Sequence, residues 1–202
     1  MKYRVSNVEA FRQWEADEEA ELADLIDKIS GEFVPSAAML AGTAFHKVLE
    51  NATSGLELNE AEELGHRFIF SSDVEIEVTP IRELRASKTY IVDGEPIVIS
   101  GQVDAIEGLR IEDHKTTARF DPDRFLAGYQ WRLYLDIFGA SLFRWNVFEL
   151  RELDDESDTV PTYAVTAAHR LEQYRYPALE ADCLALVTRF ARFVRLYIEA
   201  VA

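Results

Sequence analysis

Cysteine is almost absent from this chain of 202 residues, because Cys183 is the only one. A single thiol forms no disulfide within the chain, and it cannot by itself hold a structural zinc ion or an iron–sulfur cluster. If the protein binds a metal, we therefore expect oxygen and imidazole ligands and no iron–sulfur cluster.

Long hydrophobic runs are also missing, since no stretch approaches the roughly 20 apolar residues that cross a bilayer. The first residues, from Met1 to Arg4, lead into a polar helical pattern instead of a secretory signal. We expect a cytoplasmic protein with no membrane partner. The composition, 48% hydrophobic and 11% aromatic, is typical of globular proteins, and no linker or repeat divides the chain. Residues 1–202 are predicted to form a single domain.

The chain lacks an excess of basic residues, since its formal net charge is −16. This balance argues at first against a nucleic-acid partner, because phosphate is usually bound by a basic surface. The charge is unevenly distributed, however. Basic residues slightly outnumber acidic ones between Arg110 and Arg151, whereas the acidic excess lies mainly in residues 15–32, 57–63 and 154–158. The objection to a nucleic-acid partner is therefore weaker for the middle of the chain.

Helical periodicity is found in both terminal parts of the chain and in two segments between them. Ser6 and Glu9 resemble a capping box, Pro35-Ser36 introduces a second helix, and Pro177 opens a long closing one. The predicted helices cover residues 6–31, 37–51, 59–66, 124–138 and the segment after residue 177. The helix over 124–138, which ends at Gly139, is apolar on nearly every side and is expected to be buried.

Alternating and β-rich patterns occupy the middle of the chain. Strands are predicted over residues 73–79, 88–92, 97–106, 109–116, 142–150 and 162–167, and residues 154–158 are predicted to be an exposed turn. Asp93-Gly94 and Glu107-Gly108 are turns, so that residues 88–116 form an antiparallel meander. Together these elements predict an α/β (α+β) fold, in which helices flank a central mixed sheet that contains an antiparallel hairpin.

The hairpin around Glu107-Gly108 carries the residues of greatest chemical interest. A two-residue loop places Asp104 opposite Ile111, whereas a four-residue loop places it opposite Asp113. Opposed residues share a sheet face and side chains alternate with a period of two, so Asp104, Asp113 and Lys115 project from one face in either register. His114 is expected to point away from them and to be structural. Two carboxylates and a lysine on one face suit a hard cation and a phosphoryl group.

An isolated Asp-x-Lys on a strand is usually part of an exposed face that carries ion pairs, because charged residues are common on surfaces. Here it is one of four ordered motifs, which are Gly42-Thr43-Ala44-Phe45-His46, Gly101-Gln102-Val103-Asp104, Asp113-His114-Lys115 and Gln130-Trp131-Arg132-Leu133-Tyr134. In this order, and on helix, strand, strand and helix, they resemble the RecB-like branch of the PD-(D/E)xK nucleases. The resemblance extends from about Ser6 to Gly139 and implies a restriction-endonuclease-like core.

The resemblance also implies roles for individual residues. Asp104 and Asp113 would be metal ligands, and His46 would approach the same metal. Lys115 would position or activate the attacking water or steady the phosphate. Gln130 and Tyr134, four residues apart on one helix face, would line the site.

In this family another acidic residue often comes from a strand upstream of the hairpin. Glu75 and Glu77 both qualify, with a slight preference for Glu77. For each residue that the resemblance assigns to the site, the alternative is an ordinary structural role, such as a packed histidine or a solvent-facing glutamate.

The activity implied is hydrolysis of DNA phosphodiester bonds that depends on Mg²⁺, with Mn²⁺ as a substitute. The small size suggests a stand-alone exonuclease of phage or of recombination and repair, acting on DNA with a free end or on single strands, as a homo-oligomer or with a recombination partner. One alternative is a catalytically idle nuclease-fold module for nucleic-acid binding or assembly, and another is an acidic protein that mimics DNA. Endonuclease or exonuclease action, polarity, DNA or RNA as substrate, and oligomeric state stay open.

Overall fold

The computed structural model describes residues 2–53, 59–72, 74, 76–77, 79–153 and 160–199. Its strands are β1 (Lys2–Arg4), β2 (Glu60–Glu63), β3 (His66–Phe70), β4 (Ile81–Val92), β5 (Glu95–Glu107), β6 (Arg110–Thr117), β7 (Leu142–Leu153) and β8 (Thr162–Tyr174). Its helices are α1 (Val5–Ala16), α2 (Leu22–Ser30), α3 (Ala37–Asn51), α4 (Pro122–Leu126), α5 (Gln130–Phe138) and α6 (Leu179–Val194), which continues into a π-helical turn, η1 (Arg195–Glu199).

In the described part of the chain the strands form one eight-stranded mixed sheet, with the order β1-β5-β6-β7-β8-β3-β2 and β4 paired with β5. Strand β5 is central because β4 runs antiparallel along one of its edges. Its other edge pairs with β1 near its start and with β6 near its end. Strands β6 and β7 are parallel, and β7 and β8 form a long antiparallel pair. The predicted mixed sheet with an antiparallel hairpin is confirmed.

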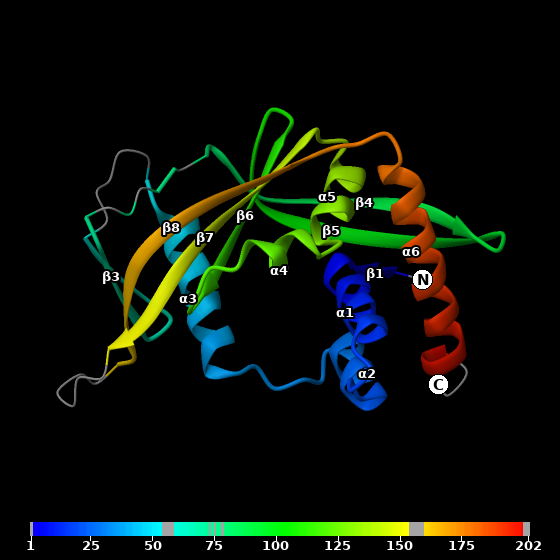
Figure 1. Ribbon diagram of the computed structural model, residues 1–202, viewed down its shortest axis with the longest axis horizontal. Helices are drawn as coiled ribbons and strands as arrows, with labels where there is room; N and C mark the ends of the chain where they lie inside the picture. The colour runs from blue at the N-terminus through cyan, green and yellow to red at the C-terminus, as the bar shows by residue number, and fades with distance from the viewer. Residues whose placement is uncertain are drawn as a thin grey trace.

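Helices cover both faces of this sheet (Figure 1). Phe143 of β7 stacks on Tyr134 of α5, whereas Phe148 of the same strand packs on Phe45 of α3 at 4.9 Å between ring centroids. Side chains alternate along a strand, so α5 and α3 lie on opposite faces. The larger core joins α1, α5 and α6 to the sheet, and a smaller one lies under α3. The site described below lies between these two cores.

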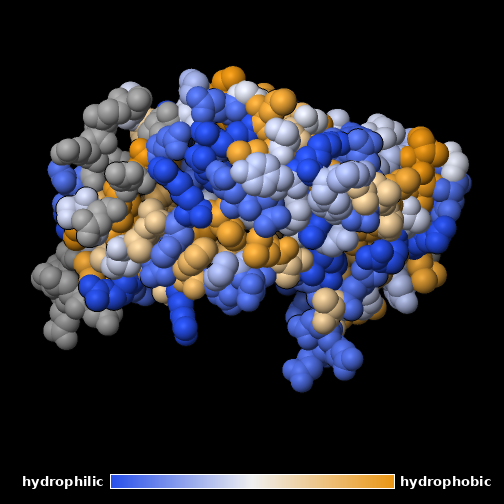
Figure 2. Space-filling view, turned by 45° about the horizontal axis from the view of Figure 1, so that its top comes forward, coloured by the Kyte–Doolittle hydropathy of each residue, from blue (hydrophilic) through white to orange (hydrophobic). Residues whose placement is uncertain are grey.

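The surface mixes hydrophilic and hydrophobic residues, as the face in Figure 2 shows. No helix in the described ranges is long and apolar enough to cross a membrane.

Local signals predicted several elements correctly. Helix α3 begins after Ser36, whose hydroxyl accepts a hydrogen bond from the Met39 backbone, and has the predicted bounds. Asp93 and Gly94 both have positive φ, 54° and 85°, as a tight hairpin turn between β4 and β5 requires. The predicted hairpins, the pairing of the β7 and β8 segments and the closing helix are confirmed.

The N-terminal helix departs from its prediction. It ends at Ala16, and a separate α2 runs to Gly31, whose φ of 81° ends that helix. The predicted capping box of Ser6 and Glu9 is wrong, because the helix begins at Val5. The side chain that accepts the Arg4 backbone N–H is that of Asn7, in the place expected of Glu9. Glu9 instead accepts a hydrogen bond from the backbone N–H of Tyr129 at 2.7 Å.

That contact also explains why the predicted helix over 124–138 is two helices. The chain turns at Gly128, where a Cβ would lie 3.3 Å from the Phe125 carbonyl oxygen, and Glu9 satisfies a backbone donor where α5 begins. The predicted burial of α5 is confirmed for five of its residues, which include Trp131 and Tyr134.

Two further predictions are wrong. Residues 59–66 are not helical but form β2 and, after a turn at Leu64-Gly65, the first residue of β3, because Phe68 and its neighbours pack on α3. The described residues 74, 76, 77 and 79 lie outside any strand, in contrast to the strand predicted over 73–79. The turn predicted at 154–158 falls outside the described residues.

Candidate active site

The hairpin of β5 and β6 opens at the two aspartates. Its strands pair only near the turn, from Glu107↔Arg110 to Ala105↔Glu112, so the loop is Gly108-Leu109. Continuing this register places Asp104 opposite Asp113, the pairing expected of a four-residue loop, although the turn has two residues and lies one position later than the predicted Glu107-Gly108. Beyond the paired region, Asp104 Oδ2 accepts a hydrogen bond from the His114 backbone N–H at 2.6 Å. A carboxylate thus replaces the next backbone partner, and the site lies where the strands separate.

Helix α3 brings His46 to this opening. His46 Nδ1 lies 3.5 Å from Asp104 Oδ2. One turn earlier, Gly42 lies against β6, and a Cβ there would be 3.0 Å from Thr116 Oγ1. The spacing in Gly-x-x-x-His therefore has a physical basis, because the glycine lets the helix approach the strand and the histidine follows on the same face.

Lys115 and Asp113 form the other half of the cluster. Lys115 Nζ lies 2.7 Å from Asp113 Oδ2. Asp113 is only 3% exposed, and apart from this ion pair its Oδ2 accepts no hydrogen bond from the described residues. A buried carboxylate oxygen without a hydrogen bond is unusual in folded proteins.

Helix α5 places Gln130 and Tyr134 beside this pair. Gln130 Nε2 donates to Tyr134 Oη at 3.4 Å. Burial, together with the charge of Asp113, raises the pKa of Tyr134 to about 12. A Cβ on Gly101 would lie 2.6 Å from the Tyr134 ring, so this glycine makes room for the tyrosine beneath β5. The structure therefore brings together all six residues of the predicted catalytic set.

The two aspartates hold their protons differently. Burial raises the pKa of Asp113; Lys115 opposes this rise and the negative charge of Asp104 adds to it. Burial acts on Asp104 in the same sense, but its hydrogen bond and charge interaction with His46 lower its pKa to about 2. Burial would lower the pKa of Lys115, but Asp113 and Asp104 raise it overall, so Lys115 is a cation at neutral pH. The pKa of His46, which burial would lower, is raised by Asp104.

Glu83 is a further acidic neighbour that the sequence reasoning missed. It lies on β4 between the pairs Arg82↔Ala105 and Leu84↔Val103, and hence across from Asp104. Its φ of 54° interrupts the ladder, and its side chain accepts a hydrogen bond from Gln102. Burial, and then the charge of Asp104, raises its pKa. The signal was present, because extending the Asp93-Gly94 hairpin residue by residue places position 83 opposite position 104.

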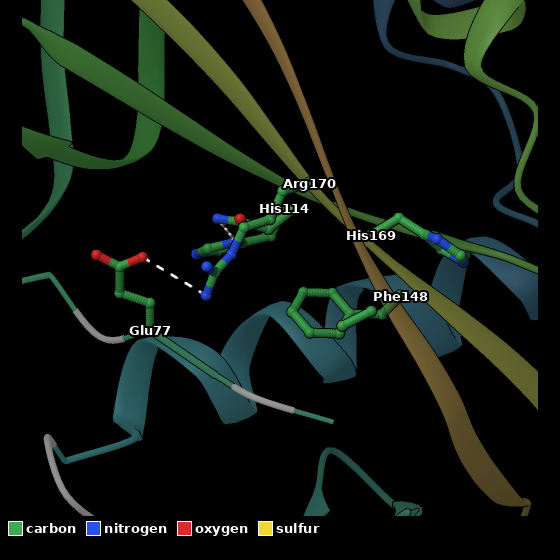
Figure 3. Close-up of a pocket in the computed structure, with 7 residues that line it drawn as sticks. Glu77, His114, Phe148, His169 and Arg170 are labelled. Carbon is green, nitrogen blue, oxygen red and sulfur yellow. Dashed lines mark hydrogen bonds and ion pairs between the residues drawn. The ribbon is translucent and has the colours of Figure 1, made fainter. Parts of the chain in front are cut away.

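Glu77 is not brought to the acid pair. Its carboxylate forms ion pairs with Arg110 at 3.1 Å, Arg144 at 3.1 Å and Arg170 at 3.6 Å. It lines a cavity of about 320 Å³ together with His114 and Phe148 (Figure 3). Glu75 falls outside the described residues. The acidic neighbour of Asp104 is therefore Glu83 on β4, and the upstream position expected from the sequence serves an arginine cluster.

His114 faces the cavity that Glu77 lines, away from Asp113 and Lys115 as expected. Its Nδ1 lies 3.3 Å from Asn146 Nδ2, and its ring centroid is 6.3 Å from that of His46. Burial lowers its pKa to about 4. It is therefore neutral at physiological pH.

Comparisons with known proteins agree with this architecture. No family model matches the chain, and no curated protein matches it. Among solved structures, SSO0001 gives a TM-score of 0.52 at 17% identity, over 92% of this chain and 73% of that one. The alkaline exonuclease LHK-Exo from Laribacter hongkongensis gives 0.50 at 16% identity, over 99% and 91%. LHK-Exo in complex with dAMP gives 0.46 at 16% identity, over 99% and 91%.

The fold resembles that of an alkaline exonuclease. At 16–17% identity this likeness concerns the fold alone, so it supports the resemblance to nucleases at that level. The roles of the site residues rest on the geometry given above.

Proposed function

We propose that the protein is a metal-dependent nuclease that hydrolyses phosphodiester bonds of DNA, with Mg²⁺ as its natural ion and Mn²⁺ as a substitute. The observation that carries the proposal is the opened hairpin, where Asp104 and Asp113 meet Lys115 from β6 and His46 from α3. The likeness to an exonuclease fold supports it. By the same likeness we propose exonuclease action on DNA ends or single strands.

The residues fit a hard divalent cation. Asp104, Asp113 and Glu83 offer carboxylate oxygens and His46 offers an imidazole nitrogen, which suit Mg²⁺ or Mn²⁺. Asp113 Oδ2 already has the Lys115 ammonium 2.7 Å away, so the fit to a cation rests on the remaining carboxylate oxygens and on His46. Within the described ranges, no group of three or more His, Cys, Asp or Glu side chains is gathered to hold an ion. This agrees with Mg²⁺ sites that use one or two carboxylates and complete their shell with water and substrate phosphate.

A bound Mg²⁺ supplies Lewis acidity toward a phosphoryl oxygen and lowers the pKa of a coordinated water. Lys115 is held as a cation by Asp113 and Asp104, so it acts through its charge on water or phosphate and not as a general base. Tyr134 keeps its proton because its pKa is raised to about 12. Since Gln130 donates to Tyr134 Oη, the tyrosine proton is free to point toward a phosphate oxygen.

The proposal is tested by incubating the protein with end-labelled linear DNA, closed circular DNA and linear RNA, each with Mg²⁺, Mn²⁺ or EDTA. We expect Mg²⁺-dependent cleavage of linear DNA. Asp104→Asn and Lys115→Ala are each expected to slow it at least about a hundredfold. Arg151→Gln, an exposed position on β7, serves as the control.

Undiminished cleavage by both variants would contradict the proposed mechanism. Absence of cleavage by the wild-type protein with either ion would favour the idle binding module. Cleavage of the closed circle would replace exonuclease by endonuclease action.

A further inference from the structure

A large groove, distinct from the cavity that Glu77 and His114 line, lies next to the candidate active site. Its volume is about 970 Å³, and its walls come from β1 and the start of α1, the end of α2, and parts of β4 and β5. Gly101, Gln102 and Tyr134 form part of its lining. Tyr134 also interacts with the charges of Asp113 and Lys115, so this wall of the groove adjoins the place where we propose that a phosphodiester is cleaved.

The charge of this groove is opposite to that of the chain. Lys2, Arg4, Lys28 and Arg85 line it with exposed side chains, and none of the described residues in its lining is Asp or Glu. None of the four forms an ion pair with a carboxylate of the described residues; Arg85 Nε donates to the neutral Gln102 side chain. In a chain with a net charge of −16, four cations without a carboxylate partner form a local attraction for polyanions.

The groove also exposes an aromatic ring. Phe33 follows the end of α2, lines the groove and is 42% exposed. Single-stranded nucleic acids are bound by this combination, in which cations follow the backbone and bases stack on aromatic side chains. Paired bases in a duplex are already stacked and offer no free face to such a ring.

We infer that this groove binds single-stranded nucleic acid and directs the strand toward Tyr134. The direction toward cleavage rests on the proposed nuclease function, whereas the binding itself does not. DNA and RNA share the required chemistry, a phosphate backbone and unpaired bases, so both belong in the test.

Binding is measured by fluorescence anisotropy in EDTA, where no Mg²⁺-dependent turnover occurs. The probes are labelled oligo(dT) and oligo(U) of about 12 nucleotides and a blunt DNA duplex. The first variant pairs Lys28→Gln with Arg85→Gln, and a second pairs Lys2→Gln with Arg4→Gln. The matched control pairs Arg151→Gln with Arg189→Gln, which changes the net charge equally at exposed positions outside the groove. Circular dichroism checks that each variant is folded.

Each groove pair is expected to weaken binding of single strands at least about fivefold relative to the control. The slope of log affinity against log salt should fall by about 1.4, because each lost phosphate contact on a single strand removes about 0.7. Phe33→Ala should weaken single-strand binding at least about fivefold and leave duplex binding unchanged. A difference between the oligo(dT) and oligo(U) probes identifies the preferred sugar.

Equal losses in groove and control variants would overturn the inference, because charge alone would then explain binding. Full binding by Phe33→Ala, or a wild-type protein that binds no single strand, would overturn it as well. If the wild type cleaves DNA but the groove variants bind single strands normally, the nuclease proposal stands and the inference about the groove is overturned. Groove-dependent binding without cleavage by the wild type would support the groove and contradict the nuclease proposal.

Discussion

The two faces of strand β6 carry buried carboxylates in very different surroundings. Glu112, which is fully buried, accepts hydrogen bonds from Arg110 Nε at 2.8 Å and Asn146 Nδ2 at 2.8 Å, with Arg144 at 3.8 Å. Its neighbour Asp113 is nearly as buried and has one close cation, Lys115.

The difference shows which carboxylate is structural. A buried carboxylate is costly unless it is paired and hydrogen-bonded, and Glu112 meets both conditions. Asp113 meets them only in part, since one of its oxygens makes no hydrogen bond with the described residues and Asp104 adds a like charge. Incomplete neutralisation of a buried acid is typical of sites that are completed by a ligand.

The largest expected effect compares the two acids directly. Glu112→Gln should lower the free energy of unfolding by about 3 kcal/mol, because Arg110 and Arg144 lose a fully buried negative partner. Asp113→Asn should change it by less than about 1 kcal/mol, because the variant removes an unfavourable proximity to Asp104 along with the Lys115 pair. Urea denaturation at pH 7 measures both. Equal destabilisation by the two variants would remove the distinction between the faces.

A smaller effect concerns His114, on the same face as Glu112. Its pKa is lowered by burial from 6.5 to about 4, so between these values the unfolded chain binds a proton that the folded chain excludes. Stability from this residue is complete well above pH 6.5 and falls as the pH decreases, by about 1.4 kcal/mol at pH 5.5.

His114→Asn should reduce the loss of stability between pH 8 and pH 5.5 by that amount in urea denaturation. His66→Asn, on β3, is the matched control and should leave the loss unchanged. An unaltered pH dependence in His114→Asn would show that the buried imidazole does not oppose protonation.

Much of the site could be predicted because its signals are local. The Ser36 cap and helical periodicity set α3, and Gly42 and His46 occupy one face of that helix wherever it packs. Strand alternation fixed the common face of Asp104, Asp113 and Lys115 before the register was known.

Other parts depend on contacts between distant segments. Glu83 joins Asp104 only because a two-residue turn sets the register of a long hairpin, and its positive φ has no sequence signature in a glutamate. Glu77 lies among arginines from β6, β7 and β8, which its own strand-like pattern could not indicate. The local pattern of residues 59–66 predicts a helix, whereas the strands form because this segment packs on the core under α3.

Thermal unfolding in the presence of Mn²⁺ tests the central claim most directly. If Asp104 and Asp113 hold a metal ion, saturating Mn²⁺ stabilises the wild-type protein, by about 2.7 kcal/mol at a hundred times the Kd. Asp113→Asn should lose this stabilisation, Glu83→Gln should reduce it and Glu77→Gln should keep it. Equal stabilisation of Asp113→Asn and the wild type would contradict a metal site in the opened hairpin.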